Sequence, residues 1–409
     1  MAFGRWAPIE HGLAPHYPAL RAFRDRRALH ASALWREIGP EVQRILSSVE
    51  RGDMISAPRP VVAAAGASAG DRPSPGRLRV VAWNIQRGAR FAELLQALRG
   101  ERFLAAADVL MLVEVDCGLG RSGNRNVPRD LALALGMSYA FAPSYLTLED
   151  DWGENPGGAA NTTALAGTAL LSRWPIRAAE NLELPELRDK FSSSERRLGK
   201  KRALGVEIDG PGGLWRLGAC HLDSNASPAG RARQLGAVLD GLERVGSGAP
   251  TTTPALVGGD LNASTHDLSS GLATARDVLR VLASGGFRRA IDDYMRPETT
   301  REHVVFDELA QRGFTIDGLN DRAAPTYHYD FADPYARQKV RRIGGPPLVW
   351  LVRRLLRRWQ SRPPARLDWI AGRGLVPLAA HVVTPRGADG RPVSDHGAVV
   401  CDVREMPLR

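Results

Sequence analysis

The stretch Pro254-Ala255-Leu256-Val257-Gly258-Gly259-Asp260-Leu261-Asn262 joins a short apolar run to two polar residues. An apolar run of this length, bounded by Pro and Gly, is typical of a buried β-strand. Asp260 and Asn262 are two residues apart, so an extended backbone points both side chains to the same side. Polar groups at the end of a buried strand lie on a rigid frame and face solvent, where α/β proteins place their chemistry.

A second stretch, Ser394-Asp395-His396-Gly397, leads into the apolar run of residues 398–401. It places a carboxylate and an imidazole in adjacent positions. Either stretch alone is equally well explained by a turn, because Gly-Asp and Ser-Asp are common turn dipeptides. Together they predict half of a hydrolytic, metal-assisted site.

The same pattern recurs at other predicted strands. Polar residues flank four further apolar runs: Asn84, Glu114, His221 and Asp368. Each has a structural explanation by itself, since Asn caps turns and a strand-end carboxylate or imidazole is often solvated or hydrogen-bonded. Their shared position at strand ends favours a single site.

Composition sets the class of protein. The chain has 409 residues, 44% hydrophobic and 24% charged, which is enough for a full core. Its three cysteines lack metal-ligand spacing, and their odd number gives no disulfide framework, so we expect a reducing, cytoplasmic compartment. We expect no signal peptide at the N-terminus, and no apolar run has the length of a membrane span.

The net charge of +10 is concentrated in one window. Residues 335–366 hold ten basic residues and no acidic one, so the rest of the chain has no net positive charge. Within this basic insertion, residues 348–359 wound as a helix place Leu, Val and Trp359 on one side, and Arg on the other with Trp350 among them. Such a helix suits a membrane surface or a protein partner, and a nucleic-acid backbone would also attract it. It could equally pack on the main domain of the protein with its arginines in solvent.

The chain divides into three parts by composition. Residues 1–56 form a predicted N-terminal helical extension, with a helix over 27–48. Residues 57–77 are rich in Ala, Gly, Ser and Pro and predict a flexible linker. Residues 78–405 alternate strands and helices and predict the main domain.

Two local patterns in the main domain specify its elements. Pro128 and Gly136 predict a helix between them, because Pro favours the first turn and Gly the end of a helix. The Gly-rich turn at 210–213 predicts a hairpin of the strands over 203–208 and 214–221. Alternating strands and helices with a hairpin indicate a mixed-sheet sandwich flanked by helices.

Taken in order, these motifs resemble the endonuclease/exonuclease/phosphatase (DNase I-like) superfamily. The resemblance spans residues 78–403 and rests on Trp83-Asn84-Ile85, Glu114, Gly167-Thr-Ala-Leu-Leu-Ser-Arg173, His221-Leu222, Gly259-Asp260-Leu-Asn262, Arg366-Leu-Asp368-Trp-Ile370 and Ser394-Asp395-His396. It implies a four-layered α/β sandwich, with two packed mixed β-sheets flanked by helices. It also implies divalent-metal-dependent hydrolysis of a phosphodiester or phosphomonoester, in a nucleic acid, a phospholipid or an inositol phosphate headgroup.

The resemblance also implies a metal site. Asn84, Glu114 and Asp395 would hold the ion, and their hard oxygen atoms suit Mg²⁺ or Mn²⁺. Arg121, just beyond the Glu114 strand, is a candidate substrate contact, although a solvated loop arginine explains it equally well.

Catalytic roles follow from the same resemblance. Asp260 and Asn262 would orient and deprotonate the attacking water. His396 would contact the phosphoryl group, with Asp368 fixing its tautomer, and His221 would donate a proton to a phosphate oxygen or the leaving group.

Departures from the family pattern leave the branch open between nuclease and phosphatase. Val113 stands where the nucleases often have Gln, and Gln86 where abasic-site endonucleases tend to have an acidic residue. His221 favours the DNase, sphingomyelinase or phosphatase-like branches. The alternative to an enzyme is a catalytically inactive scaffold of this fold that binds lipid or protein through helix 348–359. We expect a cytoplasmic protein, and this helix would allow peripheral contact with a membrane.

Overall fold

The structure is a computed structural model of the 409-residue chain. It describes residues 7–53, 76–149, 158–193, 195–246, 252–264, 287–330, 345–346, 349–350, 353–354 and 356–406.

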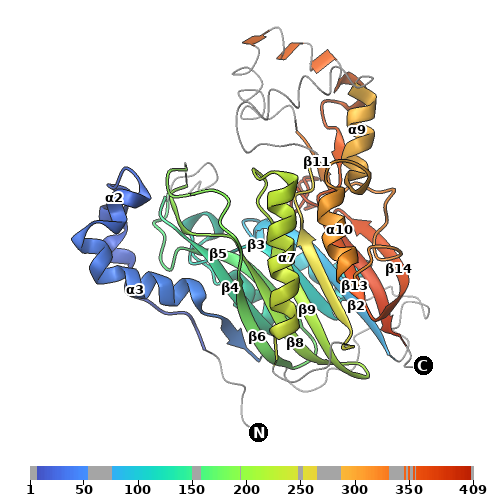
Figure 1. The fold of residues 1–409 in the computed structure, drawn as a ribbon, viewed down its shortest axis with the longest axis horizontal. Coiled ribbons are helices and arrows are strands. Elements are labelled where there is room, and N and C mark those ends of the chain that lie inside the picture. Colours follow the sequence, from blue (N-terminus) through green and yellow to red (C-terminus); the bar gives the residue numbers. More distant parts are fainter. Residues whose placement is uncertain are drawn as a thin grey trace.

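Two mixed β-sheets form the centre of the molecule (Figure 1). The larger has the order β1-β4-β5-β3-β2-β15-β14, with β7 paired to β4, and comprises β1 (Glu50–Gly52), β2 (Arg77–Arg87), β3 (Val109–Cys117), β4 (Ser138–Thr147), β5 (Leu165–Ser172), β7 (Arg197–Gly199), β14 (Leu375–Val383) and β15 (Ala398–Glu405). The smaller has the order β13-β10-β9-β8-β6 and comprises β6 (Ile176–Glu183), β8 (Arg202–Gly210), β9 (Gly213–His221), β10 (Ala255–Asp260) and β13 (Asp368–Arg373). A separate pair joins β11 (Tyr327–His328) to β12 (Pro364–Ala365).

The two sheets pack face to face. Val80 and Met111 of the larger sheet lie in one buried cluster with Leu217, Leu256 and Ile370 of the smaller. Alternate residues along each strand face this interior, as the two-residue period of a strand requires.

Helices cover the outer faces of both sheets. The larger sheet carries α4 (Phe91–Gly100), α5 (Arg102–Ala105) and α6 (Val127–Leu135), and the smaller carries α7 (Pro228–Arg244) and α10 (His303–Gln311). Helix, sheet, sheet and helix make four layers, so the predicted four-layered α/β sandwich is confirmed (Figure 1). The predicted hairpin is β8–β9, and the helix predicted between Pro128 and Gly136 is α6.

The N-terminal segment is built differently from the prediction. The helix expected over 27–48 is two helices, α2 (Arg26–His30) and α3 (Ala33–Ser47), because Ser32 accepts a hydrogen bond from the Trp35 N–H and starts a new helix. Together with α1 (Tyr17–Arg21), they lie at the opposite end of the molecule from α9 (Phe287–Met295) (Figure 1).

Beyond α3, β1 pairs with β4 and extends the larger sheet. Of the linker predicted over 57–77, residues 57–75 lie outside the described residues and Arg77 already begins β2, so the predicted boundary between extension and main domain stays a prediction.

Most of the basic insertion also lies outside the described residues. Of the helix predicted over 348–359, the structure describes a 3₁₀ turn, η5 (Leu356–Trp359), and a few residues before it. Among the helices that the structure describes, none has the length and hydrophobicity needed to cross a membrane.

Candidate active site

Three predicted site residues meet because of strand pairing in the smaller sheet. Asp260, the last residue of β10, is in register with His221, the last residue of the parallel strand β9. It is also in register with Asp368, the first residue of the antiparallel strand β13. Parallel neighbours end at the same edge of a sheet, and an antiparallel neighbour starts there, so the site follows from the topology.

Gly259 makes the approach of β10 to β9 possible. Its φ of +134° lies in a region that L side chains rarely adopt, and a Cβ here would lie 2.1 Å from the Cys220 carbonyl oxygen. Glycine before Asp260 is therefore a requirement of the backbone.

The larger sheet contributes residues from across the sandwich. The side chain of Asn84, on β2, donates a hydrogen bond to Asp260 Oδ2 at 3.3 Å. Ser394 Oγ donates to the Asn84 carbonyl at 2.6 Å, and Trp83 Nε1 donates to the His396 carbonyl at 2.9 Å. These bonds hold the loop of residues 394–396 beside the end of β10.

His396 and Asp368 form a buried pair. Nδ1 of His396 lies 2.7 Å from Asp368 Oδ2, while its Nε2 lies 3.9 Å from Asp260 Oδ2. Desolvation opposes protonation of the ring, but the charge and hydrogen bond of Asp368 outweigh it, so the pKa of His396 lies well above its ordinary value. The ring therefore presents a positively charged Nε2 toward Asp260, and the ring of Tyr327 packs on its other side, 4.7 Å away between centroids.

Asp260 lies at the centre of the cluster. Its Oδ1 accepts a hydrogen bond from the Asn262 backbone N–H at 2.8 Å, and its Oδ2 lies 3.5 Å from His221 Nε2. Desolvation, with the charge of Asp368, raises the pKa of Asp260 to about 7. A carboxylate with this pKa can exchange protons near neutral pH.

Asn262 and His221 flank this carboxylate. The Asn262 side chain donates to the Leu222 carbonyl at 3.0 Å, which fixes its orientation. Desolvation and the Lys201 ammonium lower the pKa of His221 well below its ordinary value, so its ring is neutral at pH 7.

Glu114 enters the site through an irregularity of β3. The pairing of β3 with β5 shifts register between Val113 and Val115, and Glu114 has a φ of +51°. A β-bulge of this kind re-aims a side chain. Desolvation opposes ionisation of Glu114, but the guanidinium of Arg87 favours it, and the His221 ring also favours it where that ring is charged. The net effect lowers the pKa of Glu114.

Two sets of residues offer donor atoms for a divalent cation. Glu114 and the exposed Asp395 offer the carboxylate oxygens that Mg²⁺ and Mn²⁺ prefer. Asp260, Asp368 and His396 also offer ligand atoms within 4.8 Å of one another. We favour the first set, because Asp368 holds the His396 ring in a hydrogen bond and raises its pKa, which keeps the ring protonated, whereas a histidine that binds a metal must be neutral.

Arg121 is engaged with carboxylates of the protein. Its Nε and Nη2 donate to Asp116 at 2.8 and 3.0 Å, and its Nη1 donates to Glu195 at 3.3 Å. It lines the same pocket as Glu114 and His221, but these bonds orient it for a structural role at the pocket wall. Its contact with substrate stays a prediction.

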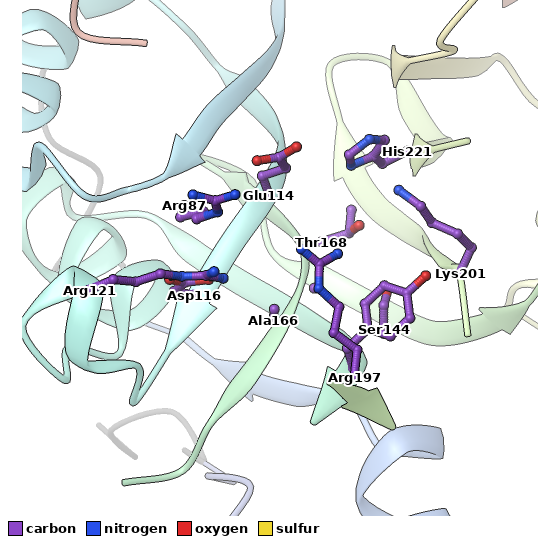
Figure 2. A pocket seen from close by; sticks show the side chains of 12 residues that line it. Arg87, Glu114, Asp116, Arg121, Ser144, Ala166, Thr168, Arg197, Lys201 and His221 are labelled. Carbon is purple, nitrogen blue, oxygen red and sulfur yellow. The ribbon is translucent and has the colours of Figure 1, made fainter. Parts of the chain in front are cut away.

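Sequence reasoning missed three basic residues, Arg87, Arg197 and Lys201, which line that pocket (Figure 2). A signal for Lys201 was present. In an antiparallel hairpin the start of one strand lies beside the end of the other, so the residues before β8 must lie near His221 at the end of β9.

Several solved structures are similar to the chain. The chain is similar to an endonuclease/exonuclease/phosphatase from Beutenbergia cavernae DSM 12333, with 19% identity over 81% of this chain and 72% of that chain and a TM-score of 0.48. It is also similar to the human Nocturnin catalytic domain with bound sulfate anion (18% identity, 82% and 97% covered, TM-score 0.44). A third similar structure is D. rerio TDP2 humanized by 14 mutations (15% identity, 80% and 99% covered, TM-score 0.42).

No curated protein matches the chain. The model of the Endonuclease/Exonuclease/phosphatase family matches residues 81–396, which include every predicted site residue. Because this match covers most of the chain and confirms the resemblance in its motifs, the chain belongs to the endonuclease/exonuclease/phosphatase family.

Proposed function

We propose that the protein is a divalent-metal-dependent phosphoesterase that hydrolyses a phosphodiester or phosphomonoester by in-line attack of water. Members of the family are typically phosphoesterase hydrolases. The observation that carries the proposal is the convergence of side chains from both sheets on Asp260, which Asn84 contacts from one sheet and His221 from the other.

Asp260 and Asn262 are the proposed water-activating residues. Asp260 has a pKa of about 7, so near neutral pH it can take the proton of a water held beside it. Asn262 is fixed by its bond to the Leu222 carbonyl and can hold that water without adding charge.

His396 is the proposed contact of the phosphoryl group. The bond to Asp368 leaves Nε2 as the free ring nitrogen, and the raised pKa keeps the ring charged at neutral pH. A fixed positive donor in a desolvated site stabilises charge that develops on phosphoryl oxygens. His221, neutral at pH 7, is placed to donate a hydrogen bond to a phosphate or leaving oxygen.

Glu114 and Asp395 are the proposed metal ligands, supported by Asn84. A divalent cation bound there would neutralise the phosphoester and polarise its P–O bonds. Asn84 adds no charge, and its amide is positioned by the Gln86 N–H, which donates to its Oδ1 at 3.1 Å.

The rival hypothesis is a catalytically inactive scaffold of the same fold. A scaffold has no need to keep Asp260 and Asp368 close together and buried at 2% and 0% exposure, because like charges in a desolvated site are costly. This arrangement supports the enzyme.

The test is the Asp260→Ala variant, assayed with plasmid DNA, sphingomyelin and inositol phosphates in Mg²⁺ or in EDTA. We expect wild-type hydrolysis of at least one substrate class, lost in EDTA, and a fall of roughly 10²–10⁴-fold in the variant. Asp317→Ala is the matched control, since Asp317 is an exposed partner of Arg322. Equal hydrolysis by Asp260→Ala and wild type, both folded by circular dichroism, would reject the assignment.

A further inference from the structure

A basic pocket adjoins the candidate active site. It shares Glu114 and His221 with that site, and its walls carry Arg87, Arg197 and Lys201 (Figure 2). The Lys201 ammonium comes from the residue directly before β8 and the His221 ring from the end of β9, while in this view Glu114 lies across the opening from Lys201.

The arginines of the pocket share few carboxylates. Glu195 pairs with Arg197 through Nε at 2.6 Å, with Arg121 at 3.3 Å and with Arg87 at 3.5 Å. Asp116 accepts two bonds from Arg121. Two carboxylates thus hold three guanidinium groups in fixed positions.

Lys201 is different from the arginines. It is only partly exposed, yet its ammonium makes no hydrogen bond or ion pair with any residue that the structure describes. An amine removed from water without a partner is costly, so a cation in this position is typical of a site that binds an anion.

The charges of the pocket match a phosphate monoester. The three arginines of its walls pair with Asp116 or Glu195, and the Lys201 ammonium adds a positive charge that pairs with no carboxylate among the residues that the structure describes. A phosphomonoester carries about −1.5 to −2 charges at pH 7.

We propose that this pocket binds a second phosphate group of the substrate, and that the substrate is a small molecule with a phosphomonoester on the same carbon skeleton as the scissile phosphoester. The proposal rests on the phosphoesterase function above. The arginines, fixed by Asp116 and Glu195, provide a preorganised wall, and Lys201 supplies the ammonium that pairs directly with the phosphate.

The first experiment compares kcat/KM for matched substrates with one and two phosphates. One pair is adenosine 5′-monophosphate and adenosine 3′,5′-bisphosphate, and the other is an inositol monophosphate and an inositol bisphosphate. We expect the wild type to prefer the bisphosphate by at least tenfold in one pair, and that pair identifies the nucleoside or the polyol as the source.

The variants test whether Lys201 carries this preference. Lys201→Met is expected to remove at least tenfold of it, and Lys201→Arg to restore part of it. Lys200→Met is the matched control, because Lys200 pairs with Glu183 and does not line this pocket. Hydrolysis without a preference for either bisphosphate, or a preference that survives Lys201→Met in a folded protein, would overturn the proposal.

A binding measurement separates this proposal from the proposed function. Titration calorimetry with the same compounds in EDTA reports affinity without turnover. Tighter binding of a bisphosphate that depends on Lys201, in a protein that hydrolyses nothing, would reject the phosphoesterase and retain the phosphate site. Hydrolysis together with equal affinity for both members of each pair would reject the phosphate site alone.

Discussion

The hydrogen bond between Asp368 and His396 is the contact on which the proposed role of His396 depends. Asp368→Asn keeps the shape of the side chain and removes its charge. The bond is 2.7 Å long and buried, and the other oxygen, Oδ1, has no hydrogen-bond partner among the described residues. Hydrogen bonds to charged groups contribute about 1.5–3 kcal/mol, so we expect the free energy of unfolding at pH 6 to fall by about 2 kcal/mol.

The pH dependence of stability gives this prediction its sign. The folded-state pKa of His396 is raised, so its contribution to stability is fully present below the ordinary histidine pKa of about 6.5. It is lost as the pH rises through the folded-state pKa. In urea titrations in EDTA, the free energy of unfolding of the wild type should therefore fall as the pH rises from 6 to 9. This fall should be smaller in Asp368→Asn.

The same variant should lower the hydrolysis rate by roughly 10²–10⁴-fold, measured well below its melting temperature. Asp402→Asn is the matched control, because Asp402 is also buried but pairs with Arg79, away from the site. It should lose stability and keep its rate. Wild-type turnover and an unchanged pH profile in Asp368→Asn would refute the reasoning.

Two further predictions concern the backbone and the basic insertion. Gly259→Ala should reduce the free energy of unfolding by about 3 kcal/mol in urea titrations, because its Cβ would meet the Cys220 carbonyl and its φ is positive. The control Gly390→Ala is also at positive φ but in open space, so it should reduce the free energy of unfolding by only about 1 kcal/mol. Equal losses in the two variants would contradict this prediction. Removing residues 344–360 should weaken co-sedimentation with anionic liposomes if their arginines meet lipid, and identical binding with and without them would reject the membrane hypothesis.

Most site positions could be predicted because they depend on where strands end. Asp260, His221 and Asp368 each border an apolar run, and sheet pairing then brings them together. The place of Lys201 in the pocket could not be predicted from the sequence with the same force, because a basic residue before a strand is usually solvated. Its lack of a partner is visible only in three dimensions.

The N-terminal strand could not be predicted either. The segment Glu50–Gly52 is short and polar, and it forms a strand only because it can pair with β4 at the edge of the larger sheet. Glu50 is 1% exposed and accepts hydrogen bonds from Tyr139 and Asn126, so its carboxylate is satisfied by residues that lie far along the chain. Tertiary partners decided this element, and local propensity did not.

The backbone at the site is one that local preferences would not select. Gln86, Arg87, Glu114 and Asn262 all have positive φ, which costs a residue with a side chain about 1–2 kcal/mol each. Three of them adjoin register shifts, between Asn84 and Arg87 on β2 and around Glu114 on β3. Because the buried faces of two sheets fix the strands on either side, the chain cannot relax these residues without losing core contacts. The sandwich thereby holds Glu114 and Asn262 at the edge where Asp260 ends its strand, and the fold supplies the energy that keeps the site assembled.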